Sequence, residues 1–146
     1  MDFEQLAFIE KWRRRAVRGV VVALDASRGD TILTLRVADL GPPLDLSGRD
    51  ETGAVRKQRL TLGDRLFVAF RYRVSDATPA TGARTANALR KGAEIEGELT
   101  AQGELAELEI GGVKILVDGD LAAFSPGETV RARIADDGAA YVIPTR

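Results

Sequence analysis

The sequence predicts an all-β protein with an N-terminal α-helix, built as two small β-barrels in tandem. Three observations support this prediction. First, apolar and polar residues alternate with period two along most of the chain, as they do in half-buried strands. Second, glycine-containing turns such as Gly111-Gly112 and Asp137-Gly138 separate the alternating runs. Third, short motifs recur in the same order in the two halves of the 146-residue chain.

The first half is expected to begin with a helix, followed by strands and a long loop. Residues 2–15 favour a helix because Asp2 lies in the first turn and basic residues fill the last turn, which matches the helix dipole. We expect this helix to plug one end of the first barrel, or to contact the second barrel or another subunit. The elements expected next are strands at 17–24 and 31–38, a Gly- and Pro-rich surface loop at 39–53, and strands at 55–62 and 65–74.

The second half holds shorter alternating runs. They predict strands at 94–99, 106–110, 113–117, 130–134 and 140–143. The segment between the halves is rich in Ala and Thr and predicts a linker, with one or two helical turns near its end at 84–90. The predicted organisation is therefore a first domain at 1–74, a linker at 75–91 and a second domain at 92–146.

Two motifs of the first half recur in the second. Val17-Arg18-Gly19-Val20 is similar to Ile95-Glu96-Gly97-Glu98, and the run from Gly63 to Val68 is similar to the run from Gly127 to Ala132. Both pairs occur in the same order along the chain. This repetition predicts that the two barrels share one design.

The second half also carries a longer pattern, KG-x-x-IxG, then G-x-LAELEIGGVKILVDGDL, then F-x-PGExVRARI. This pattern resembles the S1-type OB barrel of RNA-associated proteins, over residues 91–143 or about a third of the chain. The resemblance implies an OB-like barrel here and a diverged copy of it at residues 16–74. Leu105 and Asp118 stand where S1-type barrels usually carry an exposed aromatic residue and a histidine.

The composition argues against catalysis. The chain has no cysteine, which excludes disulfides and thiolate chemistry, and no histidine, which removes the commonest general base and metal ligand. No activated nucleophile and no Gly-rich phosphate loop is recognisable, so we expect neither an enzyme nor a cofactor. Asp118-Gly119-Asp120 is the one candidate for a hard cation, and two carboxylates are too few to predict a metal site.

Two further expectations concern location. No stretch approaches the roughly 20 apolar residues that a membrane-spanning helix needs, so we expect no membrane association. The N-terminus begins with acidic residues and lacks the basic-then-apolar pattern of a signal peptide. The sequence therefore predicts a cytoplasmic protein.

The net charge of −1 hides an asymmetry between the halves. Residues 1–92 carry 17 Lys and Arg against 11 Asp and Glu, whereas residues 93–146 carry 4 against 11. A basic half suggests a polyanionic partner, or attraction between the two halves themselves.

The strongest functional signal is the predicted strand at 65–74, RLFVAFRYRV. Alternation places an aromatic ring and several guanidinium groups on the face opposite the core. Single-stranded nucleic acid favours this arrangement, because bases stack on the ring and arginines follow the phosphates. The basic run at 56–59 would extend the surface. The predicted site residues are Arg56, Lys57, Arg59, Arg65, Phe67, Arg71 and Arg73.

The sequence therefore predicts a non-catalytic protein that binds RNA or single-stranded DNA through its basic half. Two alternatives remain open. Phe67 would be a core residue if it packs under the N-terminal helix, with the arginines as a solvated rim. The protein would be an assembly adaptor if the helix mediates self-association or protein contacts and an acidic strand face docks a basic partner. That acidic face consists of Glu94, Glu96, Glu98, Glu107 and Glu109.

Overall fold

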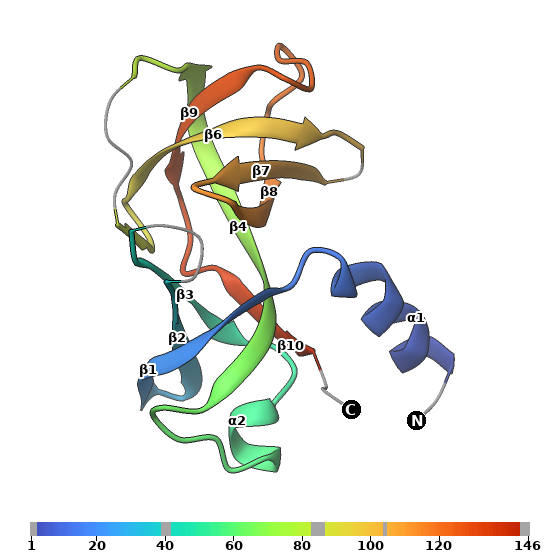
Figure 1. The fold of residues 1–146 in the computed structure, drawn as a ribbon, viewed down its shortest axis with the longest axis vertical. Helices are drawn as coiled ribbons and strands as arrows, with labels where there is room; N and C mark the ends of the chain where they lie inside the picture. Colours follow the sequence, from blue (N-terminus) through green and yellow to red (C-terminus); the bar gives the residue numbers. More distant parts are fainter. Residues whose placement is uncertain (1–2, 39–41, 83–86, 104, 144–146) are drawn as a thin grey trace.

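The computed structural model describes residues 3–38, 42–82, 87–103 and 105–143 (Figure 1). Most of these residues lie in β-strands, and the longer of two helices stands at the N-terminus, which confirms a mostly-β protein with an N-terminal helix. The elements are α1 (Phe3–Arg13), β1 (Val17–Arg28), β2 (Asp30–Val37), β3 (Leu44–Asp50), α2 (Ala54–Lys57), β4 (Arg65–Pro79), β5 (Ala88–Leu89), β6 (Glu94–Ala101), β7 (Ala106–Ile110), β8 (Val113–Asp118), β9 (Thr129–Ile134) and β10 (Ala139–Ile143).

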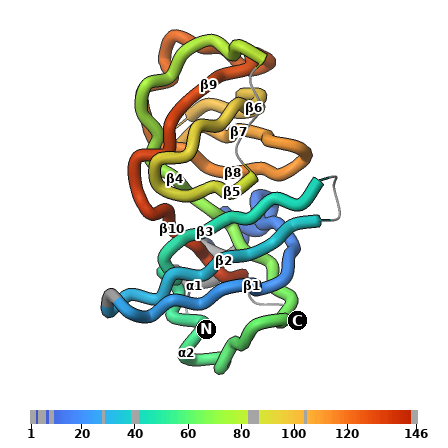
Figure 2. The backbone as a smooth tube through the Cα atoms, turned by 90° about the vertical axis from the view of Figure 1, so that its left-hand side faces the viewer, coloured from blue at the N-terminus to red at the C-terminus, as the bar shows by residue number. Residues whose placement is uncertain are grey.

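The strand pairings form two closed circuits that share β4. The first circuit runs β1–β2–β3–β10–β4 and returns to β1. The second runs β4–β8–β7–β6–β9 and returns to β4. Figures 1 and 2 show the two circuits stacked along the long axis of the molecule, with β4 extending through both. The short strand β5 pairs with β3.

The first circuit is completed by the last strand of the chain. The first residues of β4 pair with β1, and its last residues pair with β9, so β4 passes directly from the first circuit into the second. The chain then builds the second circuit and returns as β10, which pairs with β3 and β4 of the first. The prediction that the strand at 140–143 belongs with the second half is therefore wrong, because a local alternation pattern does not specify the partner of a strand.

The segments predicted as a linker, a long loop and a strand at 55–62 have a different secondary structure. The predicted linker at 75–91 starts inside β4, because Ser75, Thr78 and Pro79 pair with β9. Near its end, Ala88–Leu89 forms β5 instead of a helical turn. The division into two domains remains a prediction.

The predicted loop at 39–53 contains β3. Its alternating side chains Leu44 and Leu46 are buried, and its backbone pairs with β2. Gly48 permits a close approach to β10, because a Cβ there would lie 3.0 Å from the Ala139 carbonyl carbon. The alternation extends over only a few residues, and the surrounding glycines and prolines favour the prediction of a loop.

The predicted strand at 55–62 is replaced by the short helix α2 and a turn. The Asp50 carboxylate accepts hydrogen bonds from the backbone N–H groups of Thr52 (3.2 Å) and Val55 (2.8 Å). These bonds satisfy donors that a strand would have given to a neighbour. Gly53 precedes the helix with a φ of 69°, which a residue with a Cβ adopts only at a cost.

The repeated glycines Gly19 and Gly97 have the same role in the two circuits. A Cβ on Gly19 would lie 2.6 Å from the carbonyl oxygen of Arg36, and one on Gly97 would lie 3.0 Å from that of Glu109. In both places the strand therefore approaches its neighbour too closely for a side chain. The sequence repeat thus marks two structurally equivalent strands, β1 and β6.

One buried apolar cluster extends through both circuits, and a smaller one holds the helix. Trp12 of α1 is 6% exposed and stacks on Tyr141 of β10, with ring centroids 5.1 Å apart. The cluster also contains Ala69, Leu116 and Ile143. The helix therefore packs against the side of the circuits and does not plug the end of one.

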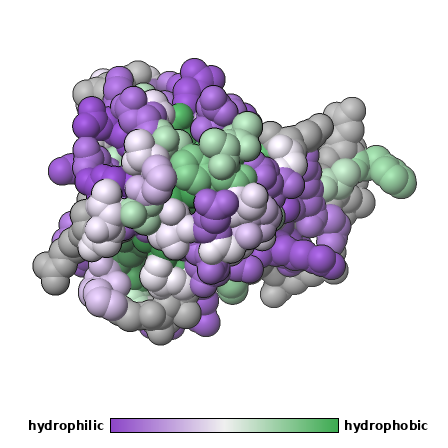
Figure 3. Space-filling view, turned by 90° about the horizontal axis from the view of Figure 1, so that it is seen from above, coloured by the Kyte–Doolittle hydropathy of each residue, from purple (hydrophilic) through white to green (hydrophobic). Residues whose placement is uncertain are grey.

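From Trp12 toward its N-terminal end, α1 extends away from the two circuits (Figures 1 and 3). Phe3, its first residue, is 90% exposed. No helix in the described part of the chain has the length and apolar character needed to span a membrane.

Candidate anion-binding site

Three arginines converge on the outer face of the first circuit. Val20 of β1 pairs with Arg36 of β2 on one side and with Arg65 of β4 on the other. Directly paired residues of antiparallel strands point to the same side of the sheet, so both guanidinium groups flank Val20. Arg18 lies two residues earlier on β1 and therefore on the same face.

These arginines line a depression of about 380 Å³. Its lining consists of Arg18, Gly19, Val20, Val22, Arg36, Ala38 and Arg65. The lining residues other than the arginines are thus apolar residues or glycine, and the described lining includes no carboxylate. The side chains of Arg18 and Arg65 make no hydrogen bond or ion pair with any other residue that the structure describes.

Arg36 differs from its two neighbours because Asp45 holds it. Its Nε and Nη2 donate to the two carboxylate oxygens of Asp45, at 2.8 and 3.1 Å. This hydrogen bonding, together with the opposite charge of Asp45, raises the pKa of Arg36 above its ordinary value. The fork-to-fork contact fixes the orientation of the guanidinium and neutralises part of its charge. The depression therefore combines one oriented arginine with two uncompensated ones.

Phe67 lies beside this depression. It pairs with Arg18 of β1 on one side and with Ile143 of β10 on the other, and it remains 40% exposed. The alternative in which Phe67 is a core residue under the N-terminal helix is therefore wrong. Trp12 covers the neighbouring position Ala69 instead.

Arg71 and Arg73 lie in a different place with balanced charge. They line a smaller depression with Arg49 and three carboxylates, those of Glu51, Asp118 and Asp136. Arg71 donates to Asp118 at 3.1 Å, and the backbone N–H of Arg73 donates to Asp136 at 3.1 Å. Acidic groups therefore offset the positive charge that the sequence suggested for this end of β4.

The basic run at 56–59 does not extend the face of β4. Arg56 and Lys57 are exposed on α2, and Arg59 follows in a turn with a φ of 51°. Of the predicted site residues, the structure thus brings together Arg65 and Phe67, and it adds Arg18 and Arg36. Only the strand pairing places the last two beside Arg65.

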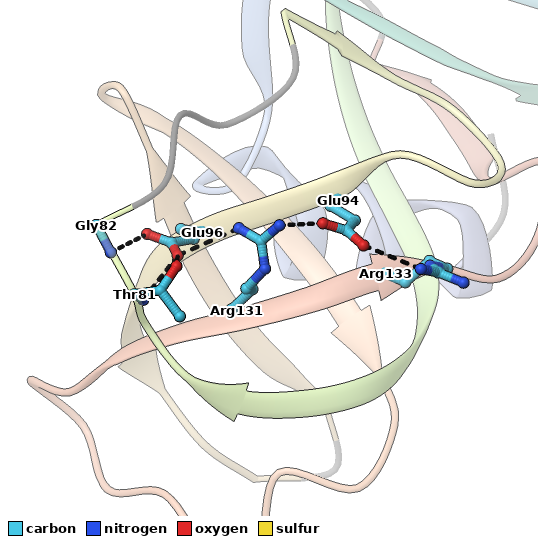
Figure 4. A network of polar contacts seen from close by, with 6 residues as sticks. All are labelled: Thr81, Gly82, Glu94, Glu96, Arg131 and Arg133. Carbon is cyan, nitrogen blue, oxygen red and sulfur yellow. Dashed lines mark hydrogen bonds and ion pairs between the residues drawn. The ribbon is translucent and has the colours of Figure 1, made fainter.

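Two of the five glutamates of the predicted acidic face, Glu94 and Glu96, lie in an ion-pair network (Figure 4). Glu94 and Glu96 of β6 pair with Arg133 and Arg131 of β9 across the sheet. Glu94 accepts from both arginines, and Glu96 accepts from Arg131 at 3.3 Å. Glu96 also accepts from the backbone N–H groups of Thr81 (2.8 Å) and Gly82 (3.2 Å). These bonds hold the residues that follow β4 against β6.

This network lowers the pKa of both carboxyls. For Glu94 the main cause is the hydrogen bond from Arg133, and for Glu96 it is the bond from the backbone N–H of Thr81. Both carboxylates are satisfied acceptors, so neither is available as an acid or base. The network is structural.

We expect the network to make stability fall in acid. A carboxyl whose pKa is lowered by folding contributes stability above its unfolded pKa, here 4.5, and loses that contribution as the pH falls through the lower folded value. In thermal melts between pH 7 and 3, the melting temperature of Glu96→Gln should therefore fall less below pH 4.5 than that of the wild type. Glu98→Gln, which changes an exposed carboxylate of the same strand, should behave like the wild type; equal acid sensitivity of all three proteins would contradict a role for the network.

Comparison with known proteins gives a similarity to a solved structure. No family model matches the chain, and no curated protein matches its sequence. Among solved structures, the chain is similar to the cytoplasmic molybdate-binding protein ModG in a crystal form with molybdate bound, with a TM-score of 0.52 and 18% sequence identity. The similarity covers 90% of this chain and 96% of that chain. At this level of identity it shows the fold.

This comparison contradicts two predicted properties. The similar structure belongs to a protein that binds molybdate, so it points away from RNA or single-stranded DNA as the partner and from a nucleic-acid-binding function. The balanced charge around Arg71 and Arg73 agrees with this correction, because a continuous basic track along β4 is missing. The comparison supports a small β-barrel fold without supporting the S1-type family in particular.

Proposed function

We propose that this protein is a non-catalytic binder of a small tetrahedral oxyanion such as molybdate. The site is the depression between Arg18, Arg36 and Arg65. The observation that carries the proposal is the presence of two uncompensated arginines beside an oriented third, around a hollow whose described lining lacks a carboxylate.

The chemistry of the guanidinium group supports this assignment. A planar fork of N–H donors matches the oxygen atoms of an oxyanion and makes charge-assisted hydrogen bonds. Because all three groups stand on strands of one sheet, their backbone positions are fixed before the ligand arrives. The volume of about 380 Å³ falls in the lower part of the range for small-molecule sites.

The fold supports the same proposal. ModG binds molybdate and matches this chain over nearly its whole length. We infer that the two strand circuits are small OB-like barrels of one design, since each contains five strands and has a glycine at the same crowded strand position. In this arrangement the first barrel carries the oxyanion site on its outer face.

We expect Arg18→Gln and Arg65→Gln each to weaken molybdate binding by about tenfold to a hundredfold, because a hydrogen bond to a charged group contributes about 1.5–3 kcal/mol. Isothermal titration calorimetry at low ionic strength measures this loss. The matched control is Arg56→Gln, which removes an exposed arginine on α2 outside the depression. Binding that survives both site substitutions, or a wild type that binds none of molybdate, sulfate and phosphate, would contradict the proposal.

A further inference from the structure

A second basic depression lies next to the first, at the seam between the two circuits. It has a volume of about 230 Å³ and is lined by Arg14, Ala16, Val17, Arg18, Val37, Gly112 and Lys114. Arg18 belongs to both depressions. Three of the lining residues are cationic, and none of the described lining residues is acidic.

Separate parts of the fold supply the three cations. Arg14 directly follows α1, whose end is anchored by the buried ring of Trp12. Arg18 comes from β1, and Lys114 comes from β8 in the second circuit, just after the Gly111-Gly112 turn. Figure 2 shows the β7–β8 hairpin beside the first circuit, near the end of β2. An ion in this hollow would therefore contact both circuits and the helix junction.

The cations of the seam differ from four other strand arginines in having no carboxylate partner among the described residues. Arg36, Arg71, Arg131 and Arg133 each have a carboxylate partner within hydrogen-bonding distance. The side chains of Arg14, Arg18 and Lys114 make no ion pair or hydrogen bond with any residue that the structure describes. Glu109 pairs with Lys114 across β7 and β8 but does not line the depression. Positive charges gathered against an apolar wall repel one another unless an anion joins them.

The backbone of the hairpin leaves room for such an ion. Gly112 lines the hollow without a side chain and takes a φ of 85°, in a two-residue turn that places Lys114 at its rim. A small anion can therefore approach the peptide backbone here as well as the cationic groups.

We propose that the seam is a second small-oxyanion site, formed by Arg14, Arg18 and Lys114, which joins the β7–β8 hairpin to the first circuit when it is occupied. The chemical class of the ligand rests on the proposed function. The location of this second site rests only on the residues that line the seam depression. Arg18 is shared, so its loss affects both sites, whereas Arg65 belongs only to the first and Lys114 only to the second.

The test counts molybdate ions per chain by equilibrium dialysis with metal analysis, in wild type and in single-site variants. The wild type should bind two ions. Lys114→Gln should weaken one of them by at least about tenfold and leave the other, Arg65→Gln should do the reverse, and Arg18→Gln should weaken both. Lys57→Gln removes an exposed cation of α2 that lines neither depression, and it should bind two ions as the wild type does.

The outcomes separate this inference from the proposed function. One ion that Arg65→Gln weakens and Lys114→Gln leaves unchanged would overturn the second site and keep the first. One ion that Lys114→Gln weakens and Arg65→Gln leaves unchanged would support the seam site and overturn the first. A single ion weakened by both variants means one ligand spanning both hollows, which overturns the second site as a separate one. No bound ion would overturn both proposals.

Discussion

Removal of β10 should unfold the first circuit, although this strand lies at the opposite end of the sequence from β1 and β2. A chain that ends at Asp136 loses the pairing of β10 with β3 and β4 and the buried side chains Ala140, Val142 and Ile143. Burial of the two larger side chains alone contributes about 3–6 kcal/mol, which is of the order of the whole stability of a small protein. We expect the shortened chain to lose its cooperative thermal transition in circular dichroism.

The control for this truncation is a chain that ends at Ile143, which retains β10 and should melt like the wild type. A synthetic peptide of residues 137–146 added to the shortened chain should restore the transition, because a strand can be supplied in trans. If the chain ending at Asp136 melts like the wild type, the return of β10 to the first circuit does not hold the protein together.

The second large effect is expected at Tyr72, which lies in the shared strand β4. Its side chain is fully buried, and its ring stacks with that of Phe70 at a centroid distance of 6.2 Å. Its hydroxyl donates to the carbonyl oxygens of Ser47 (2.7 Å) and Leu89 (3.3 Å), so it joins β4 to β3 and β5. Tyr72→Ala should reduce the free energy of unfolding by about 3–5 kcal/mol in urea denaturation, because it leaves a large cavity.

Tyr72→Phe measures the contribution of the hydroxyl separately from that of the ring. This variant keeps the packing and removes one donor, so we expect a loss of about 1–3 kcal/mol from the buried carbonyls that lose their partner. Burial raises the pKa of Tyr72 well above its ordinary value, so this phenol should stay protonated in spectroscopic titration as long as the fold persists. A loss below about 1 kcal/mol for Tyr72→Ala would contradict the central position of this residue.

The sequence predicted the parts of the fold that depend on neighbouring residues. Alternation located most strands, and it placed Arg65 and Phe67 on the outward face, because side-chain direction in a strand has period two. The repeated Gly19 and Gly97 motifs marked equivalent strands, because each glycine relieves the same crowding. The turn at Gly111-Gly112 was recognisable from its two glycines, both of which have positive φ.

The sequence could not predict which residues far apart in the chain come into contact. Arg18 and Arg36 become site residues only because β1 lies between β2 and β4, which no local pattern specifies. The sequence predicts Arg71 as a binding residue, but the parallel pairing of β4 with β8 places Asp118, 47 residues later, at 3.1 Å from its guanidinium group. The net positive charge of the first half likewise did not reveal which arginines already have partners.

A crystal structure of the full chain grown with molybdate tests the central claim most directly, because the anomalous signal of molybdenum locates the ion without reference to any variant. The proposed function predicts a peak between the guanidinium groups of Arg18, Arg36 and Arg65, with Arg36 still held by Asp45. A peak confined to other parts of the molecule, or no peak in crystals of a chain saturated with molybdate, would contradict it.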